Sequence, residues 1–103
     1  MTSPLRYSIN GEILEPGNAF LPLPDDGLLR GDGVFEVLRI YDGQPFALDL
    51  HLDRMERSAA AIELPLDRSA LEADLARLVR EGPDSCLLRL VVTRSGRRIL
   101  SLE

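Results

Sequence analysis

The apolar residues of this sequence recur at helical spacing in two stretches, and each predicts an amphipathic helix. The first helix is expected over about 49–63, because the pattern stops just before Pro65. The opposite side of this helix carries both acidic and basic residues, which is typical of a solvated helix face. The expected core face consists of Leu48, Leu52, Met55, Ala59 and Ile62.

A second helix is predicted to begin near Ser69, since a serine followed three residues later by Glu72 forms a capping-box pattern. The pair Gly82-Pro83 should end it. Its apolar stripe is formed by Leu71, Leu75, Leu78 and Val79.

Strands are predicted on both sides of the helical region. Residues 34–41 alternate and are rich in β-formers, and residues 85–93 form a strongly apolar run. Asn10-Gly11 and Asp42-Gly43 are typical hairpin turns. The remaining strands are expected at 6–10, 12–14, 44–47 and 98–102, with a short edge strand at 19–21. Because the connections are short, we expect an α+β fold in which two helices pack against one antiparallel sheet.

Composition restricts the class of protein. The 103 residues suffice for one small domain, and a net charge of −5 argues against nucleic-acid binding. No stretch is long and apolar enough to span a membrane, and the first residues lack the charged-then-apolar pattern expected of a secretory signal. The single cysteine, Cys86, lies in an apolar run and suits a reducing cytoplasm. All 12 basic residues are arginines, so the chain has no lysine.

Arg54 is the candidate binding residue of the first helix. It lies on the flank of the helix, and no acid lies one turn before or after it. Arg57, in contrast, has Asp53 one turn earlier as an expected partner. An arginine without a local partner suits a carboxylate or phosphate ligand. The alternative is a surface arginine, or one that pairs with an acid distant in sequence.

The run GDGVFEVLRIYDGQPFALDLHLDRMERSA, residues 31–59, resembles the N-terminal domain of class IV aminotransferases. This family comprises pyridoxal-phosphate (PLP) enzymes of fold type IV, among them branched-chain and D-amino-acid aminotransferases and aminodeoxychorismate lyase. The shared features are a glycine-rich loop, a V-F-E strand, a D-G turn and a helix that opens with H-x-x-R. The resemblance extends to ELPLD after the helix and to VVTRSGRR near residue 98.

The resemblance implies roles for several residues. Arg54 is the arginine of H-x-x-R and would bind the cofactor phosphate, while His51 would orient the start of the helix. Phe35 would form a wall of the substrate pocket. Arg39 lies on the same strand face and would approach that pocket or form a surface ion pair.

Arg97 and Arg98 follow a hairpin that, in some relatives, brings an arginine to the substrate carboxylate. The alternative for both is a solvated turn. The resemblance implies no metal site.

The missing lysine limits what this chain can do. In the family a lysine forms an imine with PLP and moves the α-proton. That lysine lies in the second domain, so residues 1–103 are expected to be the small first domain of a two-domain enzyme. We expect no catalytic residue in this chain and no activity from the chain alone.

The expected parent enzyme is a cytoplasmic, homodimeric aminotransferase that moves an amino group between an amino acid and a 2-oxo acid. Aminodeoxychorismate lyase is the alternative within the same chemistry. A non-catalytic association module is the alternative outside it, since a separated domain would expose an apolar surface.

Overall fold

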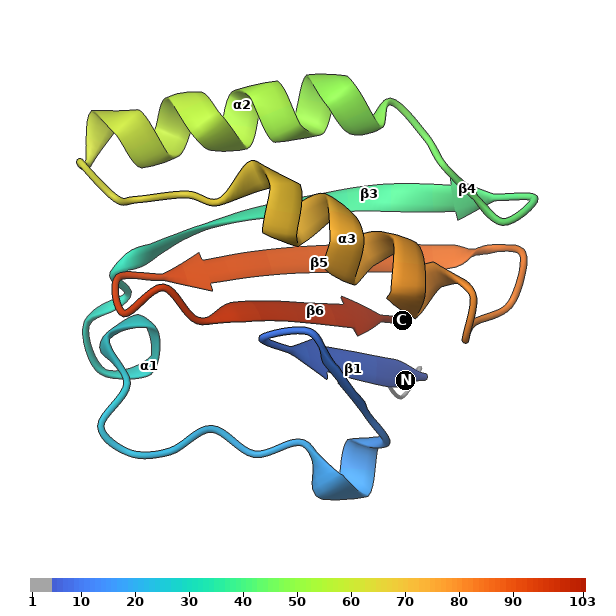
Figure 1. Cartoon of the computed structure of the whole chain (residues 1–103), viewed down its shortest axis with the longest axis horizontal. Helices are drawn as coiled ribbons and strands as arrows, with labels where there is room; N and C mark the ends of the chain where they lie inside the picture. The colour runs from blue at the N-terminus through green and yellow to red at the C-terminus, as the bar shows by residue number, and fades with distance from the viewer. Residues whose placement is uncertain (1–4) are drawn as a thin grey trace.

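A six-stranded antiparallel sheet forms the centre of the molecule (Figure 1). The structure is a computed structural model that describes residues 5–103. The strands follow the spatial order β2-β1-β6-β5-β3-β4, and each hydrogen-bonded pair is antiparallel. Their bounds are β1 Arg6–Ile9, β2 Glu12–Leu14, β3 Gly33–Tyr41, β4 Gln44–Pro45, β5 Cys86–Thr93 and β6 Arg98–Leu102.

Two helices, α2 (Leu48–Ala61) and α3 (Arg68–Val79), pack on one face of this sheet. In Figure 1, α3 crosses in front of β5 and β6, and α2 runs along β3. The short helix α1 (Asp26–Arg30) lies at one end of the sheet, after the single 3-10 turn η1 (Pro16–Asn18). The predicted α+β fold is therefore confirmed, with the short helix α1 in addition to the two helices expected from sequence.

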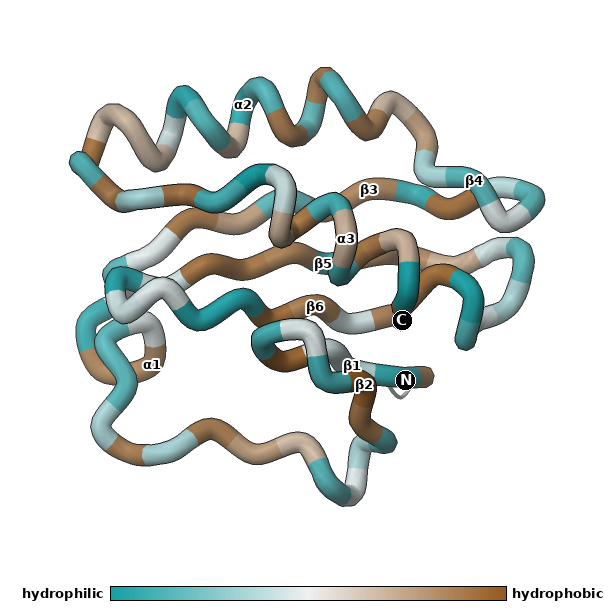
Figure 2. Tube along the Cα trace, in the orientation of Figure 1, coloured by the Kyte–Doolittle hydropathy of each residue, from teal (hydrophilic) through white to brown (hydrophobic). Residues whose placement is uncertain are grey.

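The alternation of β3 separates its side chains onto two different surfaces. The buried positions are Val34, Glu36, Leu38 and Ile40, so this set faces the helices. β5 pairs with β3 in register and contributes Leu88, Leu90 and Val92 to the same core. Figure 2 shows the result as long apolar segments along β3 and β5 and alternating polar and apolar turns along α2.

The predicted helices are confirmed, although their ends differ from the sequence pattern. Leu52, Met55 and Ala59 are buried as expected, but Ile62 is 40% exposed because α2 has already ended at Ala61. The N-cap of α3 is Asp67, whose carboxylate accepts a hydrogen bond from Ala70 N at 3.0 Å. The capping box expected at Ser69 is therefore wrong: Asp67, an ionised and stronger acceptor, begins the helix two residues earlier.

Both hairpin turns predicted from sequence are confirmed. Asn10 and Gly11 have positive φ angles of 50° and 89°, and Asp42 and Gly43 have 50° and 72°. These angles suit the tight turns that join antiparallel strands.

Two strand predictions are wrong. No strand forms at 19–21, where nearby prolines remove the backbone donors that an edge strand needs. The strand expected over 44–47 is shortened to β4, because Pro45 cannot donate and Ala47 adopts a left-handed conformation with φ 55°. As a result, β4 pairs only with the last two residues of β3, Ile40 and Tyr41.

Candidate functional site

A polar cluster between α2 and the sheet is centred on Glu36 of β3. Its side chain is 5% exposed, and both carboxylate oxygens accept hydrogen bonds from α2. Arg54 donates from Nε to Oε2 at 2.9 Å and from Nη2 to Oε1 at 2.7 Å. His51 Nδ1 lies 2.8 Å from Oε1 and, since an ionised carboxylate only accepts, carries the proton.

This cluster corrects the prediction that Arg54 lacks an acidic partner. No acid is available along the helix, but Glu36 reaches Arg54 from a strand 18 positions earlier. The alternative stated from sequence, a pair with a distant acid, is what the structure contains. The expectation that His51 orients the start of the helix fits its bond to the same carboxylate.

The ion pair changes the acidity of both groups. The hydrogen bonds from Arg54 lower the pKa of Glu36, against burial, which raises it. The bond from His51 lowers the pKa further. In return, Glu36 raises the pKa of Arg54, so the pair stays ionised at neutral pH.

Arg54 nevertheless remains accessible. Its side chain is 60% exposed, and Nη1 has no hydrogen-bond partner within residues 5–103. Together with Arg57, it lines a shallow groove of about 330 Å³ on the first half of α2. The other lining residues are Ala47, Leu50 and His51.

The prediction for Arg57 is also wrong, because the ion pair expected for Arg57 does not form. Its expected partner Asp53 accepts a hydrogen bond from Arg68 of α3 at 2.7 Å instead. No ion pair of Arg57 occurs in the described part of the chain, and its side chain is exposed. The groove thus contains one arginine that is fixed by an acid and one that is not.

The loop before β3 determines where this strand begins. Gly31 has a φ of 62°, and a Cβ added at Gly33 would lie 2.5 Å from the carbonyl oxygen of Val92. Arg94 binds the carboxylate of Asp32 at 3.1 Å and the carbonyl of Ile62 at 2.8 Å. The glycines therefore serve a turn and a close backbone approach, as expected, and Arg94 ties the loop to the end of α2.

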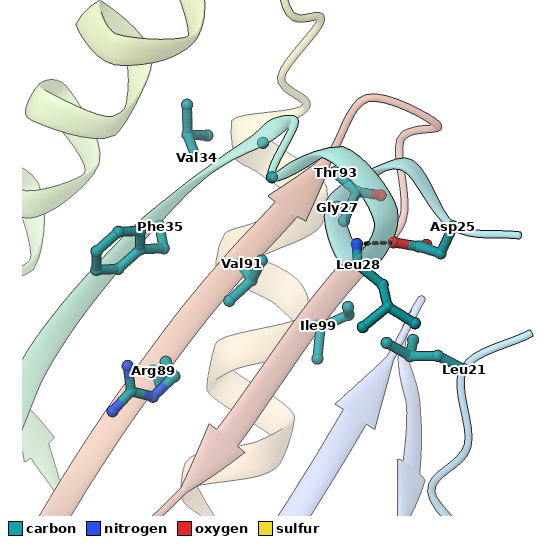
Figure 3. Close-up of a pocket in the computed structure, with 12 residues that line it drawn as sticks. Leu21, Asp25, Gly27, Leu28, Val34, Phe35, Arg89, Val91, Thr93 and Ile99 are labelled. Atoms are coloured by element: carbon teal, nitrogen blue, oxygen red, sulfur yellow. Dashed lines mark hydrogen bonds between the residues drawn. The ribbon is translucent and has the colours of Figure 1, made fainter. Parts of the chain in front are cut away.

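Phe35 lies next to Glu36 on β3 but points to the opposite side of the sheet. Its side chain is among the exposed large apolar groups, at 65% exposure. It lines an open apolar pocket of about 550 Å³ with Val91, Ile99 and Leu28 (Figure 3). Arg89 supplies a charged group at one end of this pocket, as Figure 3 also shows.

The structure therefore does not bring Phe35 and Arg54 into one cavity of this chain. Arg39 shares the strand face of Phe35 and lies over the ring of Tyr41, with 5.6 Å between its Cζ and the ring centroid. It does not line the Phe35 pocket. Along Gly33–Leu38, however, β3 is an edge strand of the described sheet, because β4 and the residue after it bond β3 only from Arg39 onward. The Phe35 pocket and the groove at Arg54 lie on opposite faces of the sheet at this edge.

Arg97 and Arg98 point to opposite faces and are both ion-paired, so neither belongs to a solvated turn. Arg97 binds Asp25, a buried residue whose carboxylate also caps α1 through Leu28 N at 3.0 Å. Arg98 donates to the buried Asp74 of α3 at 2.6 Å. In this structure both side chains therefore form ion pairs within the fold.

Sequence reasoning missed Glu36, Asp25 and Arg57 as contributors to these sites. One signal was present: Glu36 is the single acid in an otherwise apolar alternating set, and such a position needs a partner when that face is buried. Asp25 gave no comparable signal, because its partner Arg97 lies 72 residues away.

Among the described residues, no helix is long and apolar enough to cross a membrane, and no group of His, Cys, Asp and Glu side chains has the arrangement of a metal site. Cys86 is buried, as expected, and burial raises the pKa of its thiol.

Known proteins are similar to this chain in sequence and in fold. A bifunctional aminodeoxychorismate lyase / D-amino acid transaminase from Mycobacterium tuberculosis is 38% identical over 92 residues, which cover 84% of this chain and 32% of the relative. A D-alanine aminotransferase from Listeria monocytogenes is 38% identical over 80 residues, covering 76% of this chain and 28% of the relative. The chain therefore spans about a third of the length of these relatives.

A solved structure is similar to this chain over nearly its whole length. A hypothetical aminotransferase from Mycobacterium tuberculosis, in its PLP-bound form, superimposes with a TM-score of 0.79 and 32% identity, covering 95% of this chain and 39% of that one. The family model described as amino-transferase class IV matches residues 33–101, which include β3, α2, α3, β5 and all of β6 except its last residue. This chain belongs to the class IV aminotransferase family.

Proposed function

We propose that this chain is the small N-terminal domain of a PLP-dependent amino-acid aminotransferase, in which Arg54 binds the cofactor phosphate. Family membership supports the reaction class, and a solved relative is a PLP-bound form. The observation that carries the role of Arg54 is its geometry: Nε and Nη2 are bonded to Glu36, Nη1 has no partner among the described residues, and the 60% exposed side chain lines a groove.

The groove fits a phosphate group in its donors and its charge. A guanidinium has five N–H donors, and Glu36 takes the Nε donor and one from Nη2. The donors of Nη1 remain for an anion. Because Glu36 neutralises Arg54, the uncompensated positive charge of the groove comes from Arg57, which favours an anionic ligand.

The second domain would supply the lysine that this chain lacks. When bound, PLP supplies the electron sink for chemistry at the α-carbon of the amino acid. The residues of this chain would bind and orient. Arg54 would hold the phosphate, and Phe35, exposed on the edge strand β3, would shape the substrate side.

Arg39 would stay near the substrate side without lining the Phe35 pocket. Because this chain has no lysine, we infer that the chain alone does not transaminate.

Aminodeoxychorismate lyase is a second candidate function. The bifunctional Mycobacterium tuberculosis relative carries both activities in its name, and it matches 84% of this chain. Lyase activity would use the same phosphate contact, so the groove at Arg54 supports either reaction. D-alanine, a branched-chain amino acid and aminodeoxychorismate are the substrates that separate the two, tested on the protein that carries this domain.

We also propose a homodimer, which the exposed apolar face around Phe35 supports. The same face supports an association module, the non-catalytic alternative. Light scattering of the purified chain tests self-association, and a monomer at high concentration would count against both.

The role of Arg54 is tested by removing its charge. In Arg54→Gln, the affinity of the chain for PLP is expected to fall about tenfold, because a charge-assisted contact to phosphate is lost. The affinity for pyridoxal, which has no phosphate, is expected to stay unchanged. Both affinities can be measured by titration calorimetry or by NMR.

Arg57→Gln is the matched control, since it removes one positive charge from the same groove without touching the Glu36 pair. We expect a smaller loss of PLP affinity in this variant. Equal losses in both variants, or none in Arg54→Gln, would contradict a specific contact between Arg54 and phosphate.

A further inference from the structure

We propose that Glu36 is a positioning residue for phosphate binding: it holds Arg54 so that the Nη1 edge faces the groove. This inference rests on the proposed role of Arg54. Glu36 itself is buried and does not line the groove, so it acts through the arginine and not on the ligand.

The geometry of the pair explains how the positioning works. Two parallel hydrogen bonds, from Nε and Nη2, fix both the position and the plane of the guanidinium. An exposed arginine otherwise samples many rotamers, and a ligand that binds it must restrict them. Because Glu36 already restricts the rotamers of Arg54, the anion does not have to restrict them when it binds.

The carboxylate is itself held on two sides. β3 keeps Glu36 on the buried face, between Val34 and Leu38, and its backbone pairs with Leu90 of β5. The bond from His51 Nδ1 to Oε1 fixes the carboxylate from the helix side. Glu36 therefore holds the exposed end of the flexible Arg54 side chain at a fixed position relative to the sheet.

Two effects of Glu36 on an anion oppose each other, which makes the proposal testable. Its negative charge repels phosphate, so a purely electrostatic role predicts that Glu36→Gln tightens binding. Positioning predicts the reverse, because the neutral amide keeps the volume but loses the paired, charge-assisted bonds. The direction of the change in affinity distinguishes the two effects.

High salt separates them further. At 1 M ionic strength the screening length is about 3 Å, so effects of charge without direct contact largely vanish, whereas geometry is unaffected. The probes are PLP, inorganic phosphate and pyridoxal, titrated into the purified chain at low salt and at 1 M NaCl. NMR follows the Nε–H resonance of Arg54, which reports the bond to Glu36 directly.

We expect Glu36→Gln to weaken PLP and phosphate binding about fivefold at 1 M salt, to leave pyridoxal binding unchanged, and to broaden or shift the Arg54 Nε–H signal. The effect of Arg57→Gln should disappear at that salt concentration. Combined with Arg54→Gln, the change at Glu36 should have no further effect on affinity, since residues that act through one contact are not additive.

Tighter or unchanged phosphate binding in Glu36→Gln at 1 M salt would overturn the proposal. If Arg54→Gln has no effect either, the phosphate role of Arg54 fails first, and the two failures are thereby distinguished. Should Glu36→Gln unfold, Glu36→Asp keeps the charge and shortens the reach by one methylene. It should fold and still show weaker phosphate binding with unchanged pyridoxal binding; binding equal to the unsubstituted chain would contradict positioning.

Discussion

The two faces of the sheet receive side chains from the same strands but differ in what covers them. On the helix side, α2 and α3 bury Leu38, Leu88 and Leu100 to 2% exposure or less. On the other side, α1 and the segment before it are what approaches the sheet within residues 5–103, and Phe35 stays 65% exposed. Figure 3 shows apolar side chains of this second face, among them Phe35, Val91 and Ile99.

The difference shows that apolar character alone does not identify the core. Phe35 and Val91 are as apolar as the core residues Val34 and Leu90 that precede them, yet they line an open pocket. Each face also contains a buried carboxylate that an arginine neutralises: Glu36 with Arg54 on the helix side, and Asp25 with Arg97 on the other. One face is specified by packing against the helices, and the other keeps an exposed apolar surface.

The largest expected effect compares two adjacent leucines of β5. Leu88→Ala should lower the free energy of unfolding by about 3 kcal/mol, because Leu88 is fully buried and its loss leaves a cavity. Leu87 faces the other side and is only partly buried, so Leu87→Ala should cost about 1 kcal/mol. Urea unfolding followed by circular dichroism measures both. Equal losses would show that the open face is packed in solution, for example against a second copy.

A smaller effect is expected at the carboxylate of the open face. Asp25→Ala should cost about 2 kcal/mol, since it removes the N-cap of α1 and leaves Arg97 without its partner. Asp26→Ala is the matched control, because Asp26 makes only an exposed ion pair to Arg30 at 3.6 Å, and it should cost about 0.5 kcal/mol or less. Thermal unfolding and the amide signals of α1 would record the difference. Similar losses would mean that the ion pair with Arg97 is unimportant.

The smallest effect compares the pH dependence of one glutamate from each face. The pKa of Glu36 is lowered by its bonds from Arg54, and the pKa of Glu103 is lowered by its bond from Arg89 at 2.8 Å. A carboxyl group whose pKa is lower in the folded state stabilises the fold above its unfolded pKa of about 4.3. This contribution is lost as the pH falls through the lowered value.

Glu36→Gln should therefore reduce the dependence of stability on pH below about 4.3 more than Glu103→Gln does. The carboxylate of Glu103 is more exposed than that of Glu36, so the contribution of the Arg89–Glu103 pair should stay below about 1 kcal/mol and weaken with salt. Urea unfolding between pH 3 and pH 7 (roughly the range over which carboxylates titrate) measures both variants. A pH dependence as large at Glu103 as at Glu36 would show that burial is not the deciding factor.

The sequence by itself determined the local features of this protein. Turn residues at Asn10-Gly11 and Asp42-Gly43, the alternation of β3 and the helical period of α2 each depend on neighbours a few residues apart. These patterns predicted the α+β fold, and the H-x-x-R motif of the same stretch indicated the family and drew attention to Arg54.

Only the tertiary structure decided which charged groups meet. Arg54 pairs with Glu36, 18 residues away, and Arg97 pairs with Asp25, 72 residues away. Asp53, the expected partner of Arg57, is taken by Arg68 from the next helix. The physical reason is that periodicity fixes the face on which a side chain lies, whereas its ion-pair partner depends on which elements pack against that face. The same packing decides that Phe35 is exposed and Glu36 beside it is buried.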